Sequence, residues 1–166
     1  MKKDFFKAVY LFIFLLGLLG NTCLASDKFI KVDKYDGFKL ELGAVLPQKF
    51  LDKNESSQIL RISSSQTAPG YNIKSEGIEY QIGVDGSNAI IFISSADPEF
   101  VTPEKISPGM NFGDAFKGAP KSSVILERGW IGYIPFKSGW NAAVLLNERD
   151  QWSYFDKVAF VFMRKQ

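Results

Sequence analysis

The sequence predicts an α+β fold, a single domain in which an antiparallel β-sheet packs with one or two short helices. Apolar and polar residues alternate in several short runs that turn residues separate, which is typical of strands. One segment after residue 100 loses this alternation and carries residues that favour a helix start. The chain is 46% hydrophobic, which is enough for a core. An all-β sandwich or barrel is the alternative.

The N-terminus has the order of a secretory signal peptide. Residues 8–20 are almost wholly apolar and follow Lys2, Lys3 and Lys7. This run is too short to span a bilayer comfortably, since a spanning helix needs about 20 residues. Cleavage after Ala25 leaves residues 26–166 as one domain in the periplasm or outside the cell. Lipidation of Cys23, which would anchor the protein to a membrane, and an uncleaved anchor are the alternatives.

Charge after this cleavage argues against two classes of partner. The leader removes three lysines and Asp4 from totals of 20 basic and 18 acidic side chains, so the remaining numbers are equal. Nucleic acids and anionic membrane surfaces both require a basic face. We therefore expect no nucleic acid partner, and a membrane partner only if Cys23 is lipidated.

Composition also excludes several chemistries. The sequence has no histidine, so Ser-His-Asp and Cys-His mechanisms and the usual zinc and copper sites are ruled out. Its one cysteine, Cys23, lies in the predicted leader, so the mature domain has neither a disulfide nor a thiolate nucleophile. We expect no catalytic residue, no metal and no cofactor.

The first half of the mature chain contains one clear hairpin. Residues 38–42 alternate and predict a strand, and residues 51–70 are polar and predict a loop around a short helix or strand near 56–62. The alternating run 78–84 is followed by the turn residues 85–88 and by the apolar run 89–93. This arrangement is typical of a β-hairpin.

The second half begins with the predicted helix. Asn111 with Asp114 three residues later is a helix-start pattern, and Gly118 and Pro120 end the helix after about two turns. Phe112 and Phe116 then share the face that packs on the sheet. A second hairpin covers 124–146 with its turn at 137–139, and residues 158–163 are apolar on both faces, as in a central strand.

Residues 106–146 resemble the SmpA/BamE-like outer-membrane assembly lipoproteins. The pattern is carried by Ile106, Gly109-Met110, Gly118 with Pro120, and Trp130 with Tyr133. The layout of these proteins also resembles that of β-lactamase-inhibitor proteins. The resemblance implies a small extracytoplasmic α+β domain that works by contact with other proteins.

Aromatic residues in the C-terminal half are the candidate binding residues: Trp130, Tyr133, Trp140, Trp152 and Tyr154. Exposed Trp and Tyr side chains bind protein or sugar partners at low entropic cost. The alternative for Trp130 and Trp140 is that they stack across the second hairpin. The predicted function is an exported, non-catalytic interaction module whose partner is another envelope or extracellular protein.

Two further functions stay open. Asp97, Glu99 and Glu104 lie close in sequence and predict a small carboxylate-dependent hydrolase of glycans, if two of them face each other. A small-ligand carrier is the other possibility, with an apolar pocket between sheet and helix lined by Phe112 and Phe116.

Overall fold

The computed structural model describes residues 30–31, 38–51, 57–118 and 124–165. The strands are β1 (Ile30–Lys31), β2 (Ser57–Arg61), β3 (Thr67–Ser75), β4 (Ile78–Val84), β5 (Ile90–Ser95), β6 (Ile125–Glu127), β7 (Ile131–Pro135), β8 (Asn141–Leu145) and β9 (Phe160–Arg164). The helical elements are α2 (Gln48–Leu51), α3 (Phe112–Ala115) and the 3₁₀ turn η2 (Phe116–Gly118). The predicted leader, with Cys23 and Ala25, lies outside the described residues.

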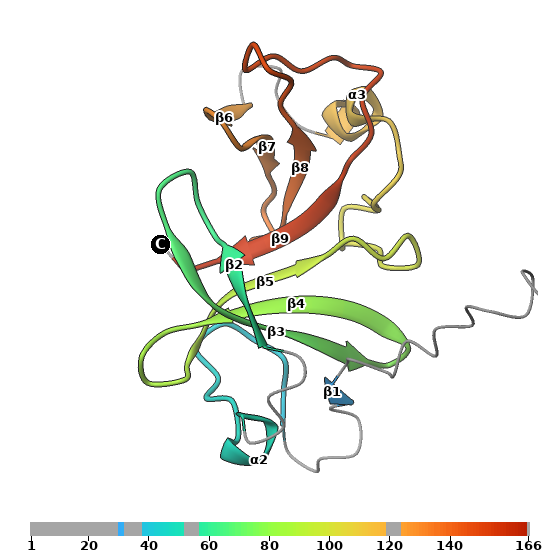
Figure 1. The fold of residues 1–166 in the computed structure, drawn as a ribbon. Coiled ribbons are helices and arrows are strands. Elements are labelled where there is room, and N and C mark those ends of the chain that lie inside the picture. The colour runs from blue at the N-terminus through green and yellow to red at the C-terminus, as the bar shows by residue number, and fades with distance from the viewer. Residues whose placement is uncertain (1–29, 32–37, 52–56, 119–123, 166) are drawn as a thin grey trace, which may run out of the picture.

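One sheet contains all the strands. Its order is β1-β3-β4-β5-β9-β8-β7-β6, and β2 pairs with the first half of β3. The pairing is antiparallel throughout except between β1 and β3. In Figure 1 the last strand, β9, runs between the β3–β5 half and the β6–β8 half and joins them. In the hydrogen-bonded order of the sheet, β9 therefore joins the two predicted hairpins.

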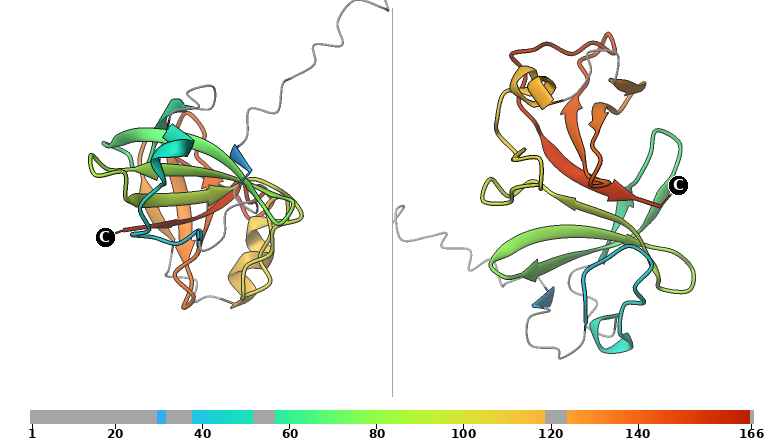
Figure 2. Two further views of the ribbon diagram at one scale, coloured as in Figure 1. Left: turned by 90° about the horizontal axis from the view of Figure 1, so that it is seen from below. Right: turned by 180° about the vertical axis from the view of Figure 1, so that it is seen from behind.

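The predicted α+β class is wrong, because the described chain is almost entirely β. Its two α-helices have four residues each, and η2 adds three more. The helix expected after Asn111 forms at the predicted place, as one turn of α-helix, Phe112–Ala115, that continues into the 3₁₀ turn η2 and ends at Gly118. The sheet does not need a helical layer, because it curls into a half-barrel and packs part of its apolar surface against itself (Figure 2).

Both predicted hairpins are confirmed. β4 and β5 are adjacent and antiparallel, and so are β7 and β8. In the first turn, one carboxylate oxygen of Asp85 accepts hydrogen bonds from the Ser87 hydroxyl and from the backbone N–H groups of Ser87 and Ala89. These bonds, with the Ser87 hydroxyl first, lower the pKa of Asp85. The central position predicted for the last strand is also confirmed, since β9 has neighbours on both sides.

Two segments were predicted wrongly. Residues 38–42 form no strand, and Phe38, Leu40 and Leu42 instead cover the outer face of the sheet. Pro69 and Gly70, which predicted a loop, lie within β3. At Gly70 a side chain would not fit, because a Cβ atom there would lie 2.7 Å from the Cβ of Leu60. The glycine is thus required by the tight approach of β2 in a strongly curved sheet.

Three apolar clusters result from the curl. The first lies on the outer face of β3–β5, where residues 38–51 cover it, and includes Phe50, Ile73 and Ile82. The second lies between α3 with η2 and the outer face of β7–β9. The third lies on the concave face and contains both Ala68 of β3 and Ile131 of β7, although four strands lie between β3 and β7 in the sheet.

A polar clasp holds the two ends of the curled sheet together. Arg164 at the end of β9 forms an ion pair with Glu127 of β6 and donates a hydrogen bond to the Tyr133 hydroxyl at 2.9 Å. The other Glu127 oxygen accepts the backbone N–H of Ser64, in the β2–β3 loop, at 2.7 Å. Arg61 at the end of β2 donates to the carbonyl of Gly129 at 3.0 Å. The β2–β3 hairpin is therefore tied to the β6–β7 hairpin across the open side of the sheet.

We expect Arg164→Ala to lower the free energy of unfolding by about 3 kcal/mol, because it leaves the Glu127 carboxylate, which is only 12% exposed, without a cation. Urea denaturation measures the change. The matched control is Lys165→Ala, which removes an exposed cation next to it in sequence and should change stability by less than about 0.5 kcal/mol. Equal stability of the two variants would show that the clasp does not hold the sheet closed.

Candidate functional site

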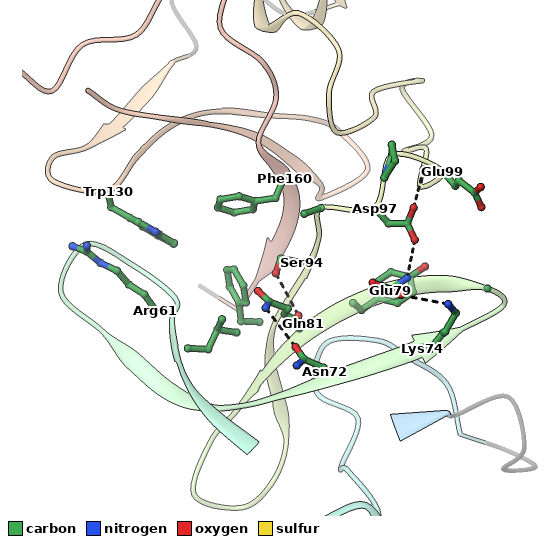
Figure 3. A pocket seen from close by; sticks show the side chains of 16 residues that line it. Arg61, Asn72, Lys74, Glu79, Gln81, Ser94, Asp97, Glu99, Trp130 and Phe160 are labelled. Carbon is green, nitrogen blue, oxygen red and sulfur yellow. Dashed lines mark hydrogen bonds and ion pairs between the residues drawn. The ribbon is translucent and has the colours of Figure 1, made fainter. Parts of the chain in front are cut away.

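The concave face of the sheet carries a groove of about 820 Å³ beside the third apolar cluster. β3, β4 and β5 form one side of it, and the β6–β7 turn with β9 forms the other (Figure 3). The lining residues are Leu60, Arg61, Asn72, Lys74, Gly77, Glu79, Tyr80, Gln81, Phe92, Ser94, Ala96, Asp97, Pro98, Glu99, Trp130 and Phe160. The volume is in the range of small-molecule sites, about 300 to 1,000 Å³.

Polar side chains from three neighbouring strands form a row along the sheet side of the groove. Asn72 of β3 lies opposite Gln81 of β4, and Gln81 lies opposite Ser94 of β5. The amide oxygen of Asn72 accepts hydrogen bonds from Gln81 at 3.4 Å and from Gln58 of β2 at 3.0 Å. The Ser94 hydroxyl, 5% exposed, donates to the backbone carbonyl of Gln81. The strand register thus places amides and a hydroxyl side by side.

Aromatic side chains form the opposite side. Trp130 and Phe160 are half-buried, and their ring centroids are 6.4 Å apart. The guanidinium of Arg61 lies over the Trp130 ring at 5.7 Å and donates to the backbone carbonyls of Ser63, Ser64 and Gly129. Arg61 therefore fixes the position of Trp130 at the same time as it closes the sheet.

Charged groups lie at the end of the groove that is formed by the β3–β4 turn and the loop after β5. Lys74 and Glu79, opposite each other on β3 and β4, form an ion pair at 3.4 Å. The two oxygens of Asp97 accept the backbone N–H groups of Glu79 and Glu99 at 3.1 and 2.9 Å. Asp97 thus holds the loop after β5 against β4, and the exposed Glu99 lies at the rim.

The five candidate binding residues lie in separate places. Only Trp130 lines the groove. Tyr133 is 7% exposed, lies in the concave cluster and accepts the hydrogen bond from Arg164. Trp140 is half-buried with its ring 4.7 Å from that of Phe100 and packs on the two outer clusters, so it does not stack on Trp130 across the hairpin. Trp152 and Tyr154 are near α3.

Trp152 belongs to an aromatic cluster that attaches the loop before β9 to α3. Its ring stacks on Phe116 at 5.3 Å and meets Phe112 and Tyr154 edge-on at 5.2 Å each. The backbone N–H of Gly113 donates to the carbonyl of Tyr154 in the same region. Phe112 and Phe116 are 0% and 6% exposed, so the helix and sheet enclose a filled core where an apolar carrier pocket was predicted.

We expect Trp152→Ala to lower the free energy of unfolding by about 2 to 3 kcal/mol, because it removes the ring that the helix and the loop share. Thermal or urea unfolding measures the loss. Trp152→Phe, which keeps an aromatic ring, should lose less than about 1.5 kcal/mol. A Trp152→Ala protein as stable as the wild type would contradict a structural role.

The three acids of the predicted hydrolase do not form one group. Asp97 and Glu99 line the groove, whereas the Glu104 carboxylate accepts the backbone N–H and the hydroxyl of Ser138 in the β7–β8 turn, at 3.0 and 2.8 Å. Partial burial alone would raise the pKa of Glu104, but hydrogen bonds from Ser138 and Thr102 and from its own backbone hold it below its usual value of 4.5. A general acid needs the opposite shift.

Glu104 should instead stabilise the β7–β8 turn in a pH-dependent way. A carboxyl whose pKa is lowered by folding stabilises the protein above pH 4.5, and this stabilisation is lost as the pH falls through the lower, folded-state pKa. We expect Glu104→Gln to reduce stability at neutral pH, and the difference from the wild type to shrink below pH 4.5. Urea unfolding over this pH range tests it. A difference that is constant with pH would contradict the proposal.

The sequence reasoning missed most of the groove. Gln81 occupies a polar position of the alternating run 78–84, whereas Asn72 and Ser94 lie outside the runs for which a strand was predicted. The signal was the register of two consecutive strands, since a hairpin of 67–75 with 78–84 places Asn72 and Gln81 opposite each other. Phe160 was assigned only to a central strand.

The part of the chain that the structure describes contains no cluster of three or more His, Cys, Asp or Glu residues suited to a metal ion. Within the same residues, no helix is both long and apolar enough to cross a membrane.

Comparisons with known proteins give no family. No protein-family model matches the sequence, and no curated protein matches it. Among solved structures, the uncharacterized protein yfeY from Escherichia coli overlaps 82% of this chain and 99% of its own, with a TM-score of 0.49 and 11% identity. An extracellular protein containing a SCP domain from Bacillus anthracis overlaps 75% of this chain and 44% of its own, with a TM-score of 0.42 and 18% identity. The resemblance of residues 106–146 to SmpA/BamE-like proteins stays a prediction.

Proposed function

We propose that the protein is an exported, non-catalytic binding module and that the concave groove is its binding site. The observation that carries the proposal is the two-sided lining of this groove, with Trp130 and Phe160 facing the row of Asn72, Gln81 and Ser94. Binding pockets typically combine aromatic surface with a few placed polar groups. Export is supported by the leader-like order of residues 1–25.

The arrangement of the acids supports binding over hydrolysis. Both oxygens of Asp97 are engaged by backbone N–H groups, and Glu79 is paired with Lys74. Glu104 is held at a distant turn by Ser138. Glycoside hydrolysis needs one carboxyl that is protonated and a second that is ionised on either side of the bond. Asp97 and Glu79 are committed to holding the fold, so a catalytic pair is not favoured.

A second surface favours contact with another envelope or extracellular protein. Phe155 is 86% exposed and Tyr154 49% exposed, in the loop that connects β8 to β9. Exposed aromatic side chains are enriched in protein interfaces. The groove is the stronger candidate, because it is concave and combines apolar with polar groups.

Thermal unfolding with three classes of probe tests the proposal: a neutral oligosaccharide (cellotetraose), an uncharged hexapeptide and palmitate. We expect one class to stabilise the protein, by about 2.7 kcal/mol when the probe is at 100 times its dissociation constant. Trp130→Ala and Gln81→Ala should reduce this gain at the same probe concentration.

Phe155→Ala is the matched control, since it removes an aromatic side chain far from the groove. It should keep the full stabilisation. If no class stabilises the wild type, the groove is not a binding site. Loss of envelope-protein capture in Phe155→Ala, with Trp130→Ala unaffected, would favour the second surface instead.

A further inference from the structure

The hydrogen-bonding groups on the sheet side of the groove are only partly used by the protein. The amide oxygen of Asn72 accepts from Gln58 and Gln81, which fixes both neighbouring amides. The amide nitrogen of Asn72 and the amide oxygen of Gln81 have no protein partner among the described residues. Ser94 donates to a backbone carbonyl, so its lone pairs remain able to accept. The row therefore offers a ligand both a donor, on Asn72, and acceptors, on Gln81 and Ser94.

The aromatic side offers ring surface that the protein covers only in part, since Arg61 lies over one face of Trp130. Trp130 and Phe160 are inclined by 36° at a centroid distance of 6.4 Å, so they do not stack on each other. Both are half-buried and line the groove. Figure 3 shows them on the side opposite Asn72 and Gln81.

Three ligand classes fit this lining poorly. An acyl chain would cover Asn72 and Gln81 without replacing their hydrogen bonds to water, which costs free energy for each group. A phosphate ligand requires free cations, but Lys74 is paired with Glu79 and Arg61 donates to three backbone carbonyls. An extended peptide is bound most readily at a free strand edge, whereas the groove lies on the face of the paired strands β3–β5.

A pyranose ring has the complementary surfaces. One face of the ring presents C–H groups, which can lie against an aromatic side chain, and its edge presents hydroxyl groups. Each hydroxyl both donates and accepts, so adjacent hydroxyls can pair with the Asn72 amide nitrogen and the Gln81 amide oxygen. The exposed carboxylate of Glu99 at the rim can accept from a further hydroxyl.

We propose that the groove binds a neutral saccharide, with the ring against Trp130 and its hydroxyls on Asn72 and Gln81. This proposal rests on the binding function proposed above and names its ligand class. The saccharide is either a free oligosaccharide or part of a wall polymer, since both present the same ring.

Isothermal titration calorimetry with cellotetraose, chitotetraose and sorbitol tests the ligand class. Sorbitol carries hydroxyls but no ring. We expect at least one of the two oligosaccharides to bind and sorbitol not to bind, because stacking on Trp130 needs a ring face. Co-sedimentation with insoluble chitin or peptidoglycan shows whether the same site takes a polymer as well.

Variants test the placement of the saccharide. Trp130→Ala should weaken binding about tenfold or more, and Gln81→Ala about fivefold, which corresponds to the loss of one hydrogen bond. Gln81 is exposed, so its removal leaves the fold intact even if Trp130→Ala does not. Phe155→Ala and Gln151→Ala, which remove an exposed aromatic and an exposed amide elsewhere, should bind as the wild type does.

Each failure has a distinct meaning. If the hexapeptide or palmitate stabilises the protein and no saccharide binds, the saccharide proposal is wrong and the binding function stands. If none of the probes binds, both proposals fall. Saccharide binding that is equal in wild type, Trp130→Ala and Gln81→Ala would place the sugar elsewhere, and equal binding of sorbitol would contradict ring stacking.

Discussion

The ion pair between Arg164 and Glu127 is the interaction on which the curvature of the sheet depends. β6 and β9 are separated in the sheet by β7 and β8, and yet their side chains meet on the concave face. Glu127 also accepts the backbone N–H of Ser64, which belongs to the opposite end of the sheet. One carboxylate thus connects three segments that are distant in the sheet. A flat sheet would satisfy none of these contacts and would expose the concave apolar cluster.

The same closure builds the groove. Arg61 reaches from the end of β2 to Gly129, and in doing so its guanidinium lies over Trp130. The aromatic side of the groove is therefore positioned by the group that ties the hairpins together. The row of Asn72, Gln81 and Ser94 is positioned differently, by backbone pairing within β3–β5. One side of the site is fixed by strand register and the other by side-chain contacts across the half-barrel.

Local patterns predicted local structure well. The hairpin of β4 and β5 follows from alternation plus the hydrogen-bonding capacity of Asp85 in its turn, both of which act over a few residues. The short helix after Asn111 and its end at Gly118 were also predicted, but the start signal does not reveal that Phe116 begins a 3₁₀ turn and that its ring stacks on Trp152. The fold class was wrong because the curvature of the sheet, which removes the need for a helical layer, depends on contacts across the whole sheet.

Long-range contacts explain why the candidate site was only partly predicted. Trp130 was identified from its residue type, but its partner Phe160 is thirty residues away on a strand that sequence patterns placed only in the core. Tyr133 looked equally suited to binding, but it is 7% exposed and accepts a hydrogen bond from Arg164 of β9, so it lies in the interior. No short window of sequence indicates the polar clasp. The same is true of the arrangement in which the amides of Asn72 and Gln81 lie opposite the rings of Trp130 and Phe160.

The place of β9 in the middle of the sheet has a consequence for biosynthesis. Its residues, 160–164, are synthesised after those of all the other described strands, and they pair both with β8 and with β5, which lies far earlier in the chain. Until they emerge, two hairpins with exposed edges exist side by side without the strand that unites them. Such late, non-local pairing slows folding and leaves nascent edges open to aggregation. The sheet is thus complete only once β9, the last of its described strands to be synthesised, has emerged.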